Sequence, residues 1–217
     1  MDEARVRQLL AALAAELGER TILWRGAEPT GSDIDVLVLN GARGELEGRL
    51  AHEGLERRDD GHWAAPEGEV VVDPVDEADW PPAYPAAAGI AERAEYLAGS
   101  PPVASAADRM LIFAAEAVAG RPLAKLLPKL RALMERPEVV DDALALGASE
   151  GALSLARLAA EPDRLERAQV RGVLSYRMAL ATGIRSRRGR AAVRTRLAAT
   201  AERRLRGRGR RARRQGA

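Results

Sequence analysis

Apolar positions follow two different spacings in the first third of the chain, and together they predict a small sheet with helices. Leu9, Leu10, Leu13 and Leu17 recur at the spacing of one helix face, whereas residues 33–39 form an apolar, β-branched run typical of a strand. The elements predicted here are, in order, a helix over residues 2–17, a strand over 21–25, a loop over 26–32, a strand over 33–39, a helix over 43–54, a strand over 55–64 with a turn at 59–61, and a strand over 69–75 that stops near Pro74.

A proline-rich connection over residues 76–85 separates this part from a second one, in which apolar positions follow helical spacing. Ser105 followed by Asp108 resembles a capping box at the start of one of these helices. The helices predicted here cover residues 85–97, 105–119, 122–135, 139–146, 150–159, 163–182 and 189–206.

The order of elements predicts an α/β (α+β) fold, in which a mixed sheet of four or five strands with flanking helices is followed by an all-helical half. The predicted domains are a sheet-containing domain over residues 1–80, a helical domain over 86–183, and an arginine-rich helix with a disordered tail over 184–217.

Composition removes several classes of function. The chain has no cysteine, which excludes disulfides, thiolate metal sites and a cysteine nucleophile. No apolar run approaches the roughly 20 residues that a membrane-spanning helix needs. The first 20 residues mix acidic and basic side chains among their leucines, unlike a signal peptide. We therefore expect no membrane span and a cytoplasmic location.

Charge is distributed unevenly along the chain. Residues 185–217 contain 14 arginines and one acidic residue, Glu202, while the residues before them carry 20 of the 34 basic and 31 of the 32 acidic side chains. Three interpretations of this basic tail remain open: a solvated terminus that folds back on the acidic body, a nucleic-acid contact through residues 185–214, or an anionic membrane surface. Arginine without aromatic residues favours phosphate contact over base stacking.

The chemistry that the sequence predicts most strongly begins at Asp33 and Asp35. They lie two residues apart at the start of an apolar strand, so both carboxylates project from the same face, about 7 Å apart. Two like charges at this spacing repel each other and gain nothing for stability. A magnesium ion, which prefers hard oxygen ligands, removes the conflict.

Asp73 follows three valines at the end of a later predicted strand. If that strand pairs beside residues 33–39, three carboxylates meet and can hold two cations about 3.5–4 Å apart, as in enzymes that catalyse in-line phosphoryl displacement. Asp76 is the nearest substitute for Asp73.

The segment GSDIDVLVL, preceded by a strand that ends at Gly26 and followed by VVVD, resembles the nucleotidyltransferase superfamily related to DNA polymerase β. The resemblance covers residues 20–75. It implies a polymerase-β-like sheet and the transfer of a nucleoside monophosphate from an NTP to an acceptor hydroxyl, with release of pyrophosphate.

The same resemblance implies roles for individual residues. Asp33 and Asp35 would bind two Mg²⁺ ions, and Asp73 would bind the catalytic ion and help to deprotonate the acceptor. Gly26, Gly31 and Ser32 would contact the NTP phosphates, mainly through backbone amides. From its place beside this loop, Arg25 would either pair with phosphate or face outward at a strand end.

Other families that use similar motifs fit less well. A P-loop is excluded because the lysine is missing after Gly31. Too few residues precede Asp33 for a nucleotide-sugar glycosyltransferase, and the residues around the D-x-D do not match a haloacid-dehalogenase-like phosphatase.

An alternative comes from a different class. The loop between Gly26 and Asp33 contains six residues, which is shorter than the family usually has. A chain that has lost triphosphate binding would act as a non-catalytic binding or regulatory module that contacts nucleic acid through its tail. The acceptor is not indicated by any motif.

Four further polar residues complete the predictions. We expect His52 and His62 to be surface residues, because they show no ligand pattern. Arg109 and Glu116 lie on a predicted helix and are weaker candidates for an acceptor site.

Overall fold

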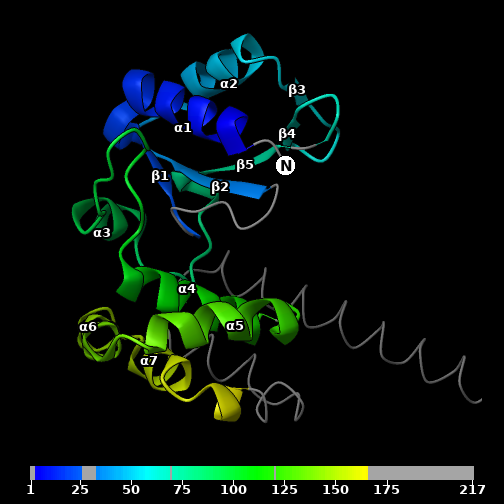
Figure 1. Ribbon diagram of the computed structural model, residues 1–217. Helices are drawn as coiled ribbons and strands as arrows, with labels where there is room; N and C mark the ends of the chain where they lie inside the picture. The colour runs from blue at the N-terminus through cyan, green and yellow to red at the C-terminus, as the bar shows by residue number, and fades with distance from the viewer. Residues whose placement is uncertain (1–2, 26–32, 69, 120, 166–217) are drawn as a thin grey trace, which may run out of the picture. The chain divides into compact units, whose positions relative to one another are not determined.

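The computed structural model describes residues 3–25, 33–68, 70–119 and 121–165, which form two compact units (Figure 1). The first unit ends at Ile112 and the second begins at Phe113, within helix α4. The first contains α1 (Glu3–Leu17), η1 (Gly18–Arg20), β1 (Thr21–Leu23), β2 (Asp33–Val38), α2 (Arg43–His52), β3 (Glu56–Arg57), β4 (Trp63–Ala64), β5 (Val71–Asp76), η2 (Glu77–Asp79), α3 (Ala87–Glu92) and the start of α4 (Ala106–Val118).

The strands form one mixed sheet of five strands in the order β1-β2-β5-β4-β3. β2 and β5 are parallel, and the other neighbouring pairs are antiparallel. α2 and the β3–β4 hairpin connect β2 to β5, which gives the long crossover that a parallel pair needs. The predicted mixed sheet with flanking helices is therefore confirmed.

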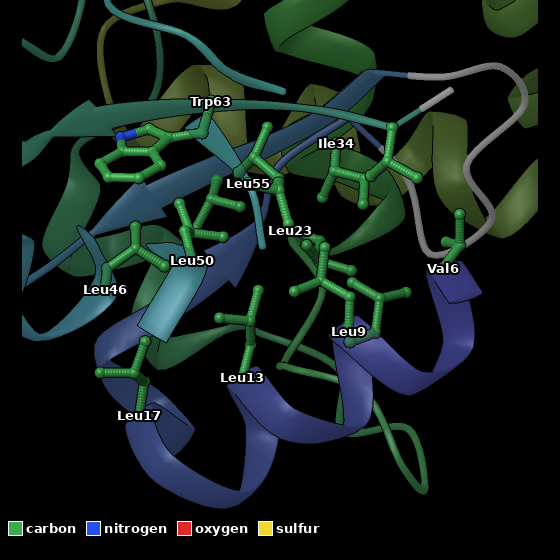
Figure 2. Packing of buried hydrophobic residues seen from close by; sticks show 14 of the residues in the cluster. Val6, Leu9, Leu13, Leu17, Leu23, Ile34, Leu46, Leu50, Leu55 and Trp63 are labelled. Atoms are coloured by element: carbon green, nitrogen blue, oxygen red, sulfur yellow. The ribbon is translucent and has the colours of Figure 1, made fainter. Parts of the chain in front are cut away.

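Each face of the sheet has its own apolar cluster, because side chains alternate along β2. Ile34, Val36 and Val38 belong to a cluster that also contains the buried leucines of α1 and α2. Figure 2 shows these leucines pointing toward the sheet. Leu37 belongs to the opposite cluster, which includes Ile90 of α3. Burial of the sheet on both faces explains why β2 has an apolar side chain at every position after Asp35.

The strand predicted over residues 69–75, with a stop near Pro74, ends at Asp76, one residue later than predicted, and Pro74 lies within it. Pro74 is the parallel partner of Val36 on β2. On the other side of β5, the antiparallel β4 pairs only with Val71 and Val72. The first residue of β4, Trp63, lies opposite Val72, so the pairing does not reach Pro74. The proline therefore lies beyond the antiparallel ladder, where its missing N–H costs no hydrogen bond to β4.

The helix predicted over residues 85–97 is also shorter than expected, and α3 ends at Glu92. Glu95 instead exchanges two backbone hydrogen bonds with Val103, at 2.7 and 2.8 Å. Leu23 of β1 donates to the carbonyl of Pro102, so this segment extends the edge of the sheet. These non-local hydrogen bonds override the helical pattern.

In the second unit, α4 is followed by α5 (Leu123–Met134), α6 (Pro137–Ser149) and α7 (Leu153–Ala159), as predicted. α6 and α7 approach closely at Gly147, where an added Cβ would lie 2.6 Å from the Cβ of Ala156. The helix predicted over 163–182 lies outside the described residues from 166 on, as does all of the one over 189–206. Within the described residues, no helix is both long and apolar enough to cross a membrane.

Candidate functional site

The three acidic residues that the sequence singled out lie on one face of the sheet. Asp35 and Asp73 are register partners on the parallel strands β2 and β5, so their side chains project side by side. Asp33 lies two residues before Asp35 and therefore shares this face. The strand of Asp73 thus pairs with the D-x-D strand, which is the condition on which the sequence argument for this cluster depended.

Asp76, the substitute for Asp73, is three residues further along β5 and falls on the opposite face. Its carboxylate accepts a hydrogen bond from Arg43, which also donates to the carbonyl of Pro74. Asp76 thus helps to attach α2 to the end of β5, and Asp73 is the acid that lies beside Asp35.

Asp35 is buried and forms an ion pair with Arg25. One Arg25 Nη lies 2.6 Å from Asp35 Oδ1, and the two side chains are 14% and 7% exposed. The guanidinium also lies over the ring of Trp24, 4.2 Å from its centroid, in cation–π geometry. The alternative in which Arg25 faces outward is wrong, because the chain bends after β1 and directs this side chain onto Asp35.

Asp73 has a basic neighbour of its own, His62. The antiparallel register pairs Trp63 with Val72, and one residue further this register sets His62 opposite Asp73. His62 Nε2 lies 3.4 Å from Asp73 Oδ1. The His62 side chain is 36% exposed, as expected of a surface residue, but the sequence did not predict its contact with Asp73. The sequence predicts the turn at 59–61, but the contact of His62 with Asp73 can be predicted only when the register of the hairpin against β5 is known.

The imidazole of His62 is held from its other side by Asp60. His62 Nδ1 lies 3.0 Å from Asp60 Oδ2, and the backbone N–H of His62 donates to Asp60 Oδ1. Burial lowers the pKa of His62, but the hydrogen bond to Asp60 and the charge of Asp73 raise it by more, so the pKa lies above its ordinary 6.5. The two hydrogen bonds from His62 lower the pKa of Asp60.

Four residues occupy adjacent backbone positions across the sheet: Trp24 directly after β1, Asp35 in β2, Asp73 in β5, and His62 directly before β4. The Trp24 N–H donates to the carbonyl of Asp35, which continues the β1–β2 pairing. The charged groups at or next to these positions are, in order, the Arg25 guanidinium, the Asp35 and Asp73 carboxylates, and the His62 imidazole. The two carboxylates that are neighbours on the sheet are thus each balanced by a basic side chain from a flanking segment.

The donor chemistry of this row suits a divalent cation, because carboxylate oxygens are the ligands that Mg²⁺ prefers. Among the residues that the structure describes, however, no group of three or more acidic or histidine side chains is arranged as a set of metal ligands. Asp35 is engaged by Arg25 and Asp73 by His62. In this structure, Asp35 and Asp73 are therefore paired with cationic side chains of the protein itself.

Three predicted nucleotide-binding residues, Gly26, Gly31 and Ser32, lie outside the described residues, as does the basic tail at 185–214. Glu116, a weaker candidate, is buried and lies 3.4 Å from Arg121 in an ion pair. Arg109 is half-buried on the same helix. Their roles stay predictions.

No protein-family model and no curated protein matches the chain. The identification of a site therefore depends on the geometry of β2, β5 and the hairpin before β4.

Proposed function

We propose that this protein is a Mg²⁺-dependent nucleotidyltransferase, which transfers a nucleoside monophosphate from an NTP to an acceptor hydroxyl and releases pyrophosphate. The observation that supports it is the parallel pairing of Asp35 with Asp73, which brings the D-x-D and the third acid onto one face of the sheet. Carboxylates that neighbour each other in this way are costly in a folded protein unless a cation uses them.

Each side chain has a role in this proposal. Asp33, Asp35 and Asp73 would hold the Mg²⁺ ions, and Asp73 would also accept the proton of the acceptor hydroxyl. Bound there, Mg²⁺ would supply charge neutralisation at the phosphates and at the attacking and leaving oxygens. Arg25 lies directly before residues 26–32 in the chain and would have to exchange its ion pair with Asp35 for a contact with the triphosphate.

The test is calorimetric titration of the full chain with each NTP, with and without Mg²⁺. We expect binding that depends on Mg²⁺ and is lost in Asp33→Asn and Asp35→Asn. The control is Asp141→Asn, which makes the same charge change at an exposed residue of α6. Mg²⁺-dependent binding that survives in both site variants, or transfer activity in both, would contradict the proposal.

A second candidate function, a non-catalytic module that contacts nucleic acid, is favoured by the ion pairs that Arg25 and His62 make with Asp35 and Asp73. In this candidate the basic side chains replace the cations permanently. Full-length protein would then bind RNA in a salt-dependent manner, and a chain that ends at Gly183 would not. NTP binding would be absent from both.

A further inference from the structure

We propose that His62 is a positioning residue of the candidate site: held by Asp60, it engages one carboxylate oxygen of Asp73 and so fixes the orientation of this carboxylate beside Asp35. The inference rests on the proposed function and extends it, since nothing in the motif that predicts the site includes His62 or Asp60.

The first argument is register. His62 directly precedes Trp63, whose antiparallel partner is Val72, so the hairpin presents His62 across from Asp73 on the same face. This pairing makes the two side chains neighbours, and His62 Nε2 lies 3.4 Å from Asp73 Oδ1. A chance contact between two mobile surface side chains would have no such cause.

The second argument is that the imidazole is itself fixed. The turn before β4 is closed by hydrogen bonds from the Arg58 N–H to the His62 carbonyl, at 2.8 Å, and from the Gly61 N–H to the Arg58 carbonyl, at 3.0 Å. Gly61 has a φ of 89°, which favours glycine at this position. Asp60 then binds both the backbone N–H and Nδ1 of His62. The ring is thus oriented before it meets Asp73.

The third argument is what remains available on Asp73. His62 engages Oδ1, and the Asp73 side chain is still 32% exposed. A carboxylate that is oriented by one oxygen keeps the other for a ligand, and such partners of metal ligands commonly change metal affinity by about 10–100-fold when they are removed. His62 is therefore assigned to positioning, without contact to substrate.

The test uses three variants of the full chain, whose fold is checked by thermal unfolding, and Mn²⁺ alone as the probe, with bound metal measured by electron paramagnetic resonance. The amide nitrogen of glutamine reaches the place of Nε2, and that of asparagine reaches only the place of Nδ1. We expect His62→Gln to keep nearly the wild-type affinity, and His62→Asn and His62→Ala to lose about tenfold.

Equal affinity in all three variants and the wild type would overturn the role of His62 and leave the metal site intact. Tighter binding in His62→Ala would overturn it as well, because His62 would then act as a competing counter-charge. If the wild type bound no Mn²⁺, the proposed function would fail and the role of His62 toward a metal ligand would fail with it.

Nitrogen NMR of the imidazole separates these failures, because it requires no metal. The chain has two histidines, so His52→Gln assigns the signals. We expect Asp73→Asn to shift Nε2 of His62 and Asp60→Asn to shift Nδ1. An Nε2 signal that does not respond to Asp73→Asn would overturn the contact, whatever the metal measurement shows.

Discussion

Two buried carboxylates of the first unit, Asp35 and Asp108, each bind an arginine, and the contrast between them separates a site from a structural ion pair. Asp108 is fully buried, accepts two hydrogen bonds from Arg93 and one from the Ser105 hydroxyl, and its own N–H donates to that hydroxyl. These contacts fix the start of α4, and they confirm the predicted cap.

Asp35 has the same kind of arginine partner but a different neighbourhood. The adjacent strand sets Asp73 beside it, so a second negative charge lies where a structural site would have a donor. Arg25 pairs with Asp35, while Asp73 has a basic neighbour of its own, His62. The difference teaches that a buried carboxylate bound by an arginine does not by itself indicate a site here, whereas two carboxylates in register on adjacent strands indicate a candidate site.

The largest effect on stability is expected from Asp108→Ala. It removes the buried carboxylate that accepts hydrogen bonds from Arg93 and from the Ser105 hydroxyl, which should lower the free energy of unfolding by about 3 kcal/mol. The value is at the low end for a broken buried ion pair, because the Arg93 side chain is 32% exposed. Urea unfolding measures this loss of free energy. A loss smaller than that of Asp35→Asn would contradict the distinction between Asp108 as a structural residue and Asp35 as a site residue.

Arg25→Met should come next, with a loss of about 2 kcal/mol in the absence of Mg²⁺, because the buried Asp35 loses its guanidinium partner while Asp73 still lies beside it. Mg²⁺ should restore part of this loss by binding the folded state, and should raise the Tm of this variant more than that of the wild type.

Arg93→Met is the matched control, since it removes the same group from the structural pair. Its Tm should not respond to Mg²⁺ beyond the wild-type response. Equal Mg²⁺ responses in the two methionine variants would show that the two carboxylates do not differ as we describe.

Asp35→Asn should change the free energy of unfolding by about 1 kcal/mol or less, because its amide oxygen still accepts a hydrogen bond from Arg25 and the repulsion with Asp73 falls. Mg²⁺-dependent NTP binding should nevertheless be lost. Circular dichroism on urea titration gives the first quantity and calorimetry the second; a large stability loss would place Asp35 with Asp108 as a structural residue.

The smallest effect should come from the pH dependence of His62. Its folded pKa is raised, so its contribution to stability is fully present below the unfolded pKa of about 6.5 and is lost as the pH rises through the folded pKa. NMR titration should give a pKa above 6.5 in the wild type and a lower one in Asp73→Asn. An unchanged pKa in this variant would contradict the ion pair.

Much of the fold could be predicted because its signals are local. The leucines of α1 recur within one helix, and the β-branched run of β2 lies within a single strand, so neighbouring residues suffice to recognise both. The shared face of Asp33 and Asp35 is local in the same way, since it follows from the two-residue period of a strand.

Long-range pairing supplied what these patterns could not. The backbone pairing of Glu95 with Val103 shortened α3, and the end of β4 allowed Pro74 to stay within β5. His62 and Asp73 are eleven positions apart, and their contact depends on the register of a hairpin against β5, which no local pattern contains.

The sequence alone was therefore sufficient for most of the described elements, the mixed α+β class and the face that Asp33 shares with Asp35, because each depends on spacing within one segment. The neighbours of the acids came from tertiary structure. Strand order set Asp73 beside Asp35, the bend after β1 turned Arg25 onto Asp35, and the hairpin register brought in His62. Charges interact through space, so their balance becomes defined when distant segments meet.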